Sequence, residues 1–174
     1  MKRIKIGFIG PQGSGKTTKA FELATELKKC GLDVILLSEV ARSCPFEINE
    51  GADKETQLWL LGKQLTREQS MKGQVLITDR TLLDNLVYAL RCNQDFFESL
   101  KSFVREYVNT YDLIFYMPGR DDYLKDDGIR SVDKEFRDEI EYRLQELMAL
   151  LDVQYVQVDD VVGYTLTYME NLNG

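Results

Sequence analysis

Short apolar runs alternate along this chain with longer segments in which apolar residues recur every three or four positions. The short runs predict buried strands at about 3–9, 33–37, 74–78, 112–117 and 153–158. The longer segments predict amphipathic helices at about 16–30, 53–72, 81–91, 95–109, 133–151 and from about 160. Because each crossover between parallel strands needs a helix, this alternation predicts an α/β fold with a parallel sheet covered on both faces.

The length and composition fit one globular domain that spans residues 1–174. Hydrophobic residues make up 44% of the chain and charged residues 29%, as in an ordinary folded protein. A polar stretch at 38–51 and a charged loop at about 118–131 interrupt the pattern without forming a linker. We therefore predict a single domain.

A glycine-rich turn follows the first predicted strand and reads Gly-Pro-Gln-Gly-Ser-Gly-Lys-Thr from Gly10 to Thr17. It matches the G-x-x-x-x-G-K-[ST] phosphate-binding motif and stands in the required context between a strand and a helix. Glycines let backbone N–H groups point at a phosphate, and the start of the helix adds its positive dipole end. Lys16 can reach the β- and γ-phosphates, Thr17 can bind Mg²⁺ and Thr18 can touch the α-phosphate. The predicted ATP-binding residues are Gly10, Gln12, Gly13, Ser14, Gly15, Lys16, Thr17 and Thr18.

The residues after the third predicted strand distinguish between classes of P-loop protein. Asp79 closes that strand, where a carboxylate can hold magnesium or accept a proton from an attacking hydroxyl. Motor ATPases commonly have a second acidic residue there that activates water, but here Arg80 follows. The Asn-Lys-x-Asp sequence with which GTPases read guanine does not occur in the chain. These features favour transfer of a phosphoryl group from ATP to a bound substrate.

Two further segments carry candidate catalytic groups. Glu39 follows the second predicted strand, where it can accept the proton of a hydroxyl, and Arg42 can hold an anionic group of the acceptor. The charged loop at about 118–131 has the features of a lid that closes over the phosphates. We expect Arg130 to stabilise the migrating charge from this lid. The alternatives for that role are Arg120 and Arg137.

Charge and residue usage exclude several other functions. The formal net charge is −7 and no continuous basic run exists, which argues against nucleic acid as the main partner. The chain contains no His, so hydrolase triads with a histidine base and histidine metal sites are excluded. Neither a signal peptide nor a run of apolar residues long enough for a membrane span is present. We expect a soluble, cytoplasmic protein.

With these residues in view, the sequence resembles P-loop nucleoside and nucleotide kinases. It is most similar to AAA-type ATP-binding domains related to the ribosylnicotinamide kinase domain of bacterial NAD-biosynthesis regulators. The segments that carry the resemblance are Gly10 to Thr17, Glu39-x-x-Arg42, Thr78-Asp-Arg80 and Asp126-Asp-Gly-Ile-Arg130. The Thr78-Asp-Arg80 segment, with the later Tyr88-Ala89, also resembles the Asp-Arg segment of thymidylate-type kinases. The Asp-Gly-x-Arg element resembles the lid of the ribosylnicotinamide group.

The resemblance implies a three-layer α/β/α P-loop NTPase fold with a five-stranded parallel sheet in the order 2-3-1-4-5. It implies MgATP over residues 10–18, with Thr17 and Asp79 at the metal and Arg130 of the lid above the phosphates. An acceptor would lie beside Asp79. The implied acceptor-binding residues are Glu39, Arg42, Arg80 and Asp127. The bacterial regulators also carry an adenylyltransferase and a DNA-binding segment, and we carry neither activity over.

We therefore expect a kinase that transfers the γ-phosphoryl group of MgATP to a nucleoside or nucleotide-like acceptor. Its expected catalytic residues are Lys16, Asp79, Glu39 and Arg130, and either Asp79 or Glu39 takes the acceptor proton. Two alternatives stay open, a nucleotide-dependent regulatory ATPase and a module that binds ATP without turnover. The acidic charge disfavours a polynucleotide as acceptor. The identity of the acceptor and a homo-oligomeric state are left open.

Overall fold

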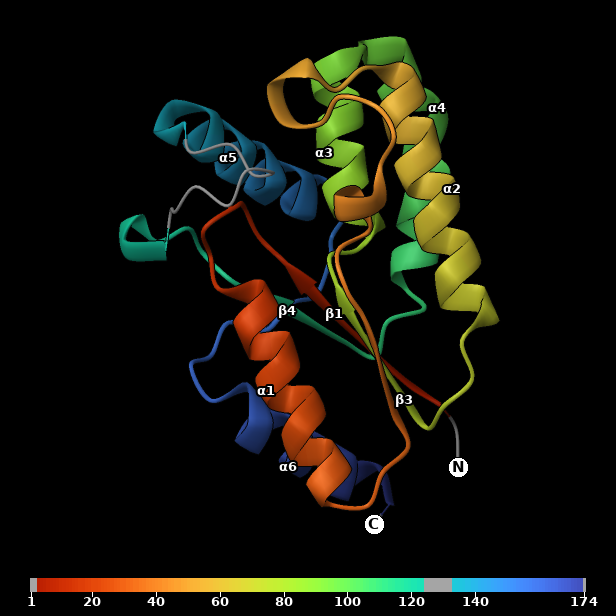
Figure 1. Cartoon of the computed structure of the whole chain (residues 1–174), viewed down its shortest axis with the longest axis vertical. Coiled ribbons are helices and arrows are strands. Elements are labelled where there is room, and N and C mark those ends of the chain that lie inside the picture. Colours follow the sequence, from red (N-terminus) through yellow and green to blue (C-terminus); the bar gives the residue numbers. More distant parts are fainter. Residues whose placement is uncertain (1–2, 124–132, 174) are drawn as a thin grey trace.

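The computed structural model describes residues 3–123 and 133–173 and has a parallel sheet at its centre (Figure 1). The strands are β1 Ile4–Ile9, β2 Val34–Leu37, β3 Val75–Asp79 and β4 Leu113–Tyr116. Their order is β2-β3-β1-β4, which confirms the predicted order of the first four strands. β1 pairs with β3 up to Phe8 opposite Asp79, so both strands end at the same edge of the sheet. The predicted α/β fold with a parallel sheet is confirmed.

The prediction of a fifth strand at 153–158 is wrong in one respect, because this segment forms a single bridge beside β4. The Tyr116 N–H donates to the Val156 carbonyl at 2.9 Å, and the Val156 N–H donates to the Ile114 carbonyl at 2.8 Å. Val156 is half-buried, but its neighbours Tyr155 and Gln157 are exposed. Little apolar surface therefore holds the segment against the sheet edge, and it separates from β4 after one paired residue.

Helices cover both faces of the sheet, with α1 and α6 on one face and α2, α3, α4 and α5 on the other (Figure 1). Their bounds are α1 Lys16–Lys29, α2 Lys54–Ser70, α3 Leu82–Cys92, α4 Gln94–Val108, α5 Lys134–Leu150 and α6 Val161–Asn173. Short 3₁₀ helices lie between them at η1 Val40–Ser43, η2 Asn49–Gly51 and η3 Asp121–Tyr123. The molecule therefore has the predicted α/β/α layers. In the two described stretches, no helix has the length and apolar character needed to cross a membrane.

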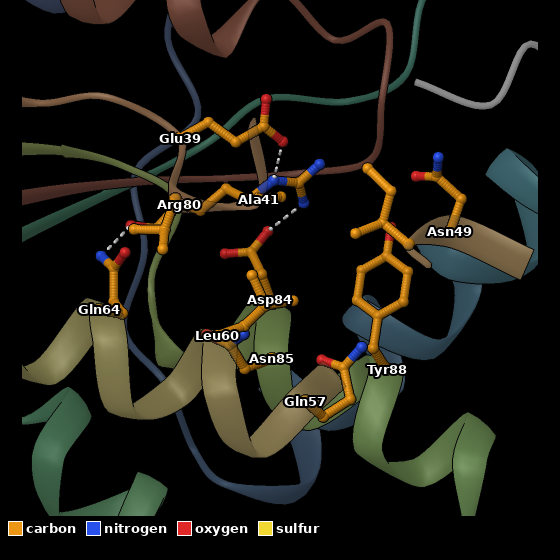
Figure 2. A pocket seen from close by; sticks show the side chains of 12 residues that line it. Glu39, Ala41, Asn49, Gln57, Leu60, Gln64, Arg80, Asp84, Asn85 and Tyr88 are labelled. Carbon is orange, nitrogen blue, oxygen red and sulfur yellow. Dashed lines mark hydrogen bonds and ion pairs between the residues drawn. The ribbon is translucent and has the colours of Figure 1, made fainter. Parts of the chain in front are cut away.

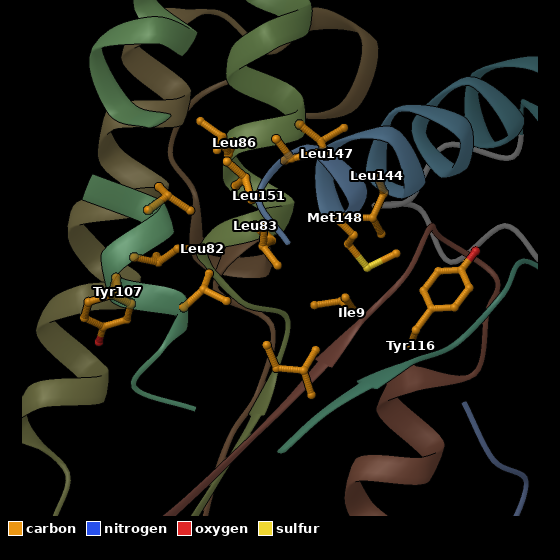
Figure 3. Close-up of a cluster of buried hydrophobic side chains, with 14 of the residues drawn as sticks. Ile9, Leu82, Leu83, Leu86, Tyr107, Tyr116, Leu144, Leu147, Met148 and Leu151 are labelled. Carbon is orange, nitrogen blue, oxygen red and sulfur yellow. The ribbon is translucent and has the colours of Figure 1, made fainter. Parts of the chain in front are cut away.

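Alternate residues of the central strand β1 face two separate hydrophobic cores. Ile6 and Phe8 pack with α1 and α6, and the ring centroids of Phe8 and Phe115 lie 5.3 Å apart. Ile9 and Tyr116 face the other core, which residues of α3, α4 and α5 complete (Figure 3). Since β1 is held from both sides, the turn that follows it starts from a rigid support.

Candidate functional site

The glycine-rich turn between β1 and α1 lies tightly against the end of β4. Gly10 has φ 147°, and a Cβ atom on it would lie 2.1 Å from the Met117 carbonyl oxygen, so only glycine fits there. Gly15, with φ 82°, immediately precedes α1 and has no side chain to cap the helix. The first N–H groups of α1 therefore lie at the carboxyl edge of the sheet, where they can bind an anion.

Lys16 folds back over this turn. Its Nζ donates to the Pro11 carbonyl and, at 2.9 Å, to the Ser14 Oγ, and both acceptors are neutral oxygen atoms. Burial lowers the pKa of the Lys16 ammonium to about 8, and the nearby Arg80 guanidinium acts in the same direction. Three carboxylates oppose this shift: Asp84, Asp79 and Glu39. The turn thus holds a buried cation where anionic phosphate oxygens would stabilise its charge.

Thr17 and Asp79 come together from two different elements. Thr17 lies in the first turn of α1 and Asp79 is the last residue of β3, and the Thr17 Oγ1 donates to the Asp79 Oδ2 at 2.6 Å. Hydroxyl and carboxylate oxygens are the hard ligands that Mg²⁺ prefers, and this ion commonly takes its remaining ligands from phosphates and water. The pair therefore fits a magnesium ion that bridges the protein and a nucleotide.

Three other predicted nucleotide contacts differ in their exposure. Ser14 and Gln12 are buried within the turn, whereas Thr18 is exposed in the first turn of α1. Neither the Oε1 nor the Nε2 of Gln12 has a hydrogen-bond partner in the part of the chain that the structure describes. Because buried amides are normally paired, this side chain has the capacity to bind a ligand oxygen.

Arg80 joins the candidate acceptor residues into one cluster (Figure 2). Its Nε donates to the Glu39 Oε1 at 2.7 Å, and its Nη1 donates to the Asp84 Oδ1 at 3.2 Å. Arg42 lies on the other side of Glu39, with 3.6 Å between the Arg42 Nε and the Glu39 Oε2. The structure therefore brings Glu39, Arg42 and Arg80 together and adds Asp84 to them.

A pocket opens beside this cluster, between η1, α2 and α3 (Figure 2). Glu39 and Arg80 lie on one side of it, and Gln57 and Tyr88 lie on the opposite side. Gln57 is buried, and its Oε1 has no hydrogen-bond partner within the described ranges. Leu60 adds apolar surface between these polar groups. The pocket can therefore hold a flat, partly apolar molecule by hydrogen bonds at both ends.

The start of α3 fixes the turn that carries Asp79 and Arg80. Thr81 caps the helix by accepting from the Leu83 N–H, and Asp84 accepts from the Thr81 N–H at 2.8 Å. Burial raises the pKa of the Asp84 carboxyl, although the Arg80 and Lys16 cations oppose that shift. Since Thr81 forms the cap, the carboxylate of Asp79 faces Thr17 instead of the helix end.

Sequence reasoning gave no site role to Gln57, Asp84 or Tyr88, because they lie on helices and not directly after strands. The sequence of α2 does carry a signal for Gln57. In this amphipathic helix Gln57, Gln64 and Glu68 all lie on the buried face. Buried polar residues at helical spacing require partners, so they indicate either a polar network or a ligand. The spacing of Asp84 after Thr81 is explained by the helix cap alone.

Two predicted site residues, Arg130 and Asp127, lie outside the described residues, as does most of the lid-like loop at 118–131. The described start of this loop is attached to the P-loop, because the Arg120 N–H donates to the Gly13 carbonyl at 3.0 Å. The two alternative arginines are paired with carboxylates, Arg120 with Asp122 and Arg137 with Asp121 and Asp138.

Known structures share this architecture at low sequence identity. Deoxyadenosine kinase from M. mycoides, solved with dCMP and a flexible dCDP, aligns with TM-score 0.65 and 20% identity over 98% of both chains. NadR protein in complex with NR aligns with TM-score 0.70 and 24% identity over 91% of this chain and 46% of NadR. Thymidylate kinase from Ehrlichia chaffeensis aligns with TM-score 0.62 and 18% identity over 99% of this chain and 100% of the thymidylate kinase chain. The similarity establishes a nucleoside and nucleotide kinase-like fold.

A comparison with curated protein sequences found no match. A family model described as AAA domain, in contrast, matches residues 5–162. The matched range includes the phosphate loop, Glu39, Asp79 and Arg80, and it extends over most of the chain. The chain therefore belongs to this AAA domain family, AAA_28.

Proposed function

We propose that this protein is an ATP-dependent kinase that transfers the γ-phosphoryl group of MgATP to a nucleoside or nucleotide-like acceptor. The observation that carries the proposal is the placement of two sites at one edge of the sheet. The phosphate loop follows β1, and the pocket with Glu39 and Arg80 lies where β2 and the adjacent β3 end. A donor phosphate and an acceptor hydroxyl bound at these sites can approach each other directly.

On the donor side, Lys16 and the first N–H groups of α1 bind the phosphates of ATP. Thr17 and Asp79 would hold a magnesium ion, which would neutralise negative charge on the phosphates of ATP. Gln12 supplies an amide to a phosphate oxygen. Arg130 stays the candidate for the cation that the lid brings to the transferred group.

On the acceptor side, the geometry favours Glu39 over Asp79 as the general base. Glu39 lines the pocket, where its Oε1 accepts from Arg80. Asp79 does not line the pocket, and its carboxylate accepts from Thr17, the other proposed magnesium ligand. Glu39 takes the proton of the acceptor hydroxyl while that oxygen forms a bond to the γ-phosphorus. The bond between the γ-phosphorus and the β–γ bridging oxygen breaks, ADP leaves, and Lys16 stabilises the charge that develops on it.

The opposite side of the pocket supports a nucleobase-like group on the acceptor. Tyr88 offers an aromatic ring and Leu60 an apolar surface, which suit a flat ring. The Gln57 Oε1 is buried and lacks a partner among the described residues, so a ligand N–H would satisfy it. A nucleobase or a ring carboxamide provides such an N–H on a flat ring, the shape that Tyr88 and Leu60 favour.

The test uses purified protein with MgATP and, in separate reactions, deoxyadenosine, thymidine monophosphate and nicotinamide riboside. For at least one acceptor, mass spectrometry should detect a product that carries one phosphoryl group more than the acceptor, formed in an amount equal to the ADP released. Glu39→Gln should lower kcat by about 100-fold or more, because the base is lost while the size of the side chain is kept. Glu47→Gln, which changes an exposed carboxylate nearby in the sequence, serves as the matched control.

The other outcomes separate the alternatives. ADP release that needs no acceptor supports a regulatory ATPase. Tight ATP binding without any ADP supports a binding module. Either result, with no phosphorylated product from the whole panel, overturns the kinase proposal.

A further inference from the structure

A buried polar cluster lies next to the acceptor pocket, between α2, α4 and the sheet. At its centre is Glu68 of α2, which is 3% exposed. Its carboxylate accepts from the Tyr107 hydroxyl at 2.9 Å and from the Tyr111 hydroxyl at 2.8 Å, and the Lys5 Nζ lies 2.6 Å away. A buried carboxylate needs such partners, and together they fix Glu68 in one position.

Gln64 connects this cluster to the acceptor pocket. It lies one helical turn before Glu68 and is 4% exposed. Its Nε2 donates to the Glu68 Oε1 at 2.6 Å. The same nitrogen donates to the Arg80 carbonyl oxygen at 3.3 Å (Figure 2). Both partners can only accept, so the nitrogen of the amide must face them. Glu68 therefore orients the group that holds the Arg80 backbone.

The Arg80 backbone has an unusual conformation, and hydrogen bonds hold it on both sides. Its φ is 94°, which is uncommon for a residue other than glycine. The Arg80 N–H donates to the Phe8 carbonyl at 3.1 Å, and its own carbonyl accepts from Gln64. The N–H and the carbonyl of Arg80 are thus both hydrogen-bonded. The guanidinium points back over the pocket to Glu39 and Asp84 (Figure 2).

We infer that Gln64 is a positioning residue for Arg80. With Glu68 as its anchor, it holds the Arg80 peptide in the conformation that directs the guanidinium to Glu39. The effect on Arg80 follows from the structure alone, and the effect on catalysis rests on the kinase function proposed above. Gln64 acts through Arg80 in this scheme and needs no contact with the reacting atoms.

The experiment replaces Gln64 by methionine, which has a similar length but no hydrogen-bond donor. The first readout is the hydrogen-exchange rate of the Arg80 Nε–H, measured by NMR. Its signal is assigned as the one that is absent from the spectrum of Arg80→Lys. In Gln64→Met this proton should exchange at least about fivefold faster, because loss of the hydrogen bond to the Arg80 carbonyl weakens the placement of the guanidinium against Glu39. The Arg143 Nε–H, which donates to Glu139 at 2.8 Å far from Gln64 in sequence, should be unchanged.

The matched control is Gln94→Met. Gln94 makes the same contact to the residue four positions later, since its Nε2 donates to the Glu98 Oε1 at 3.1 Å, but both residues are exposed on α4. This variant should leave the Arg80 signal unchanged. A folded Gln64→Met protein whose Arg80 Nε–H exchanges at the wild-type rate would overturn the inference.

Kinetics provide the second readout. They are measured with whichever of deoxyadenosine, thymidine monophosphate and nicotinamide riboside is phosphorylated. Gln64→Met should lower kcat about fivefold to tenfold while the Kd for ATP stays within about twofold of wild type. Combined with Arg80→Ala, the Gln64 change should have no further effect on the single-turnover rate, because the guanidinium that Gln64 positions is gone. Equal losses in both backgrounds would show a general structural role and overturn the inference.

If Gln64→Met does not fold, Gln64→Asn keeps a polar amide that is too short to reach the Arg80 carbonyl, and the same two readouts apply. If no acceptor is phosphorylated, the proposed kinase function fails, and the exchange rate of the Arg80 Nε–H still decides whether Gln64 positions Arg80. The two failures are therefore distinguishable.

Discussion

We predict that the buried ammonium of Lys16 makes nucleotide binding depend on pH. In the ligand-free protein, burial lowers the pKa of Lys16 to about 8, compared with an ordinary value of 10.5. A bound triphosphate places anionic oxygens beside the same ammonium, which returns its pKa to the ordinary value or above. Between about pH 8 and pH 10.5, the binding of one ATP should therefore be accompanied by the uptake of about one proton.

The size of the effect follows from the titration of this one group. At pH 8 about half of the free protein carries a charged Lys16, and at pH 9.5 only about 3% does. The phosphates of ATP are already ionised over this range, so their charge stays constant. The affinity for ATP should therefore fall about 15-fold from pH 8 to pH 9.5.

Isothermal titration calorimetry tests this prediction directly. Titrations at pH 9 in two buffers with different ionisation enthalpies should reveal the uptake of about 0.9 proton for each ATP bound. Lys16→Arg keeps its charge throughout, so its affinity for ATP should stay constant between pH 8 and pH 9.5. An affinity of the wild-type protein that is equally constant, with no proton uptake at pH 9, would refute the argument that burial lowers the pKa of Lys16.

Other changes test the surrounding geometry. Lys16→Met should raise the free energy of unfolding of the ligand-free protein at pH 7 by up to about 3 kcal/mol in urea denaturation. The buried charge destabilises the wild type below pH 8, and this loss disappears as the pH rises to 10.5, so the variants should converge at high pH. Asp79→Asn should abolish the increase in ATP affinity that Mg²⁺ causes, as measured by calorimetry with and without the metal. Thr81→Ala should lower the free energy of unfolding by about 1 kcal/mol through loss of the α3 cap, also measured in urea. Gly10→Ala should eliminate the thermal shift caused by ATP, because its Cβ would lie 2.1 Å from the Met117 carbonyl oxygen; an unchanged shift would contradict this.

The strands could be predicted from the sequence where both faces of a strand are buried. β1, β3 and β4 are almost entirely buried, so their apolar runs were sufficient to locate them. The segment at 153–158 has a similar density of apolar residues, yet it pairs with the sheet only at Val156. The length of an edge strand depends on how its neighbours bury it, and residue type alone does not determine that.

The sequence by itself determined the phosphate loop, because a short turn is governed by local backbone conformation. Gly10, Gly15, Lys16 and Thr17 lie within a few residues of one another, so their spacing already specifies the nest for a phosphate. The sequence also determined that Glu39 follows one strand and that Asp79 closes another, and parallel strands bring such residues to one edge.

The tertiary structure alone decided what surrounds the acceptor pocket. Helix spacing alone is enough to place Gln57, Gln64 and Glu68 on one face of α2, although the sequence predictions did not include it, but it does not say which residues that face would meet. The packing of α2 and α3 over the sheet places Gln57 across the pocket from Arg80 and brings Gln64 to the Arg80 carbonyl. The physical reason is that contacts between distant segments depend on how whole elements pack, which no local pattern encodes.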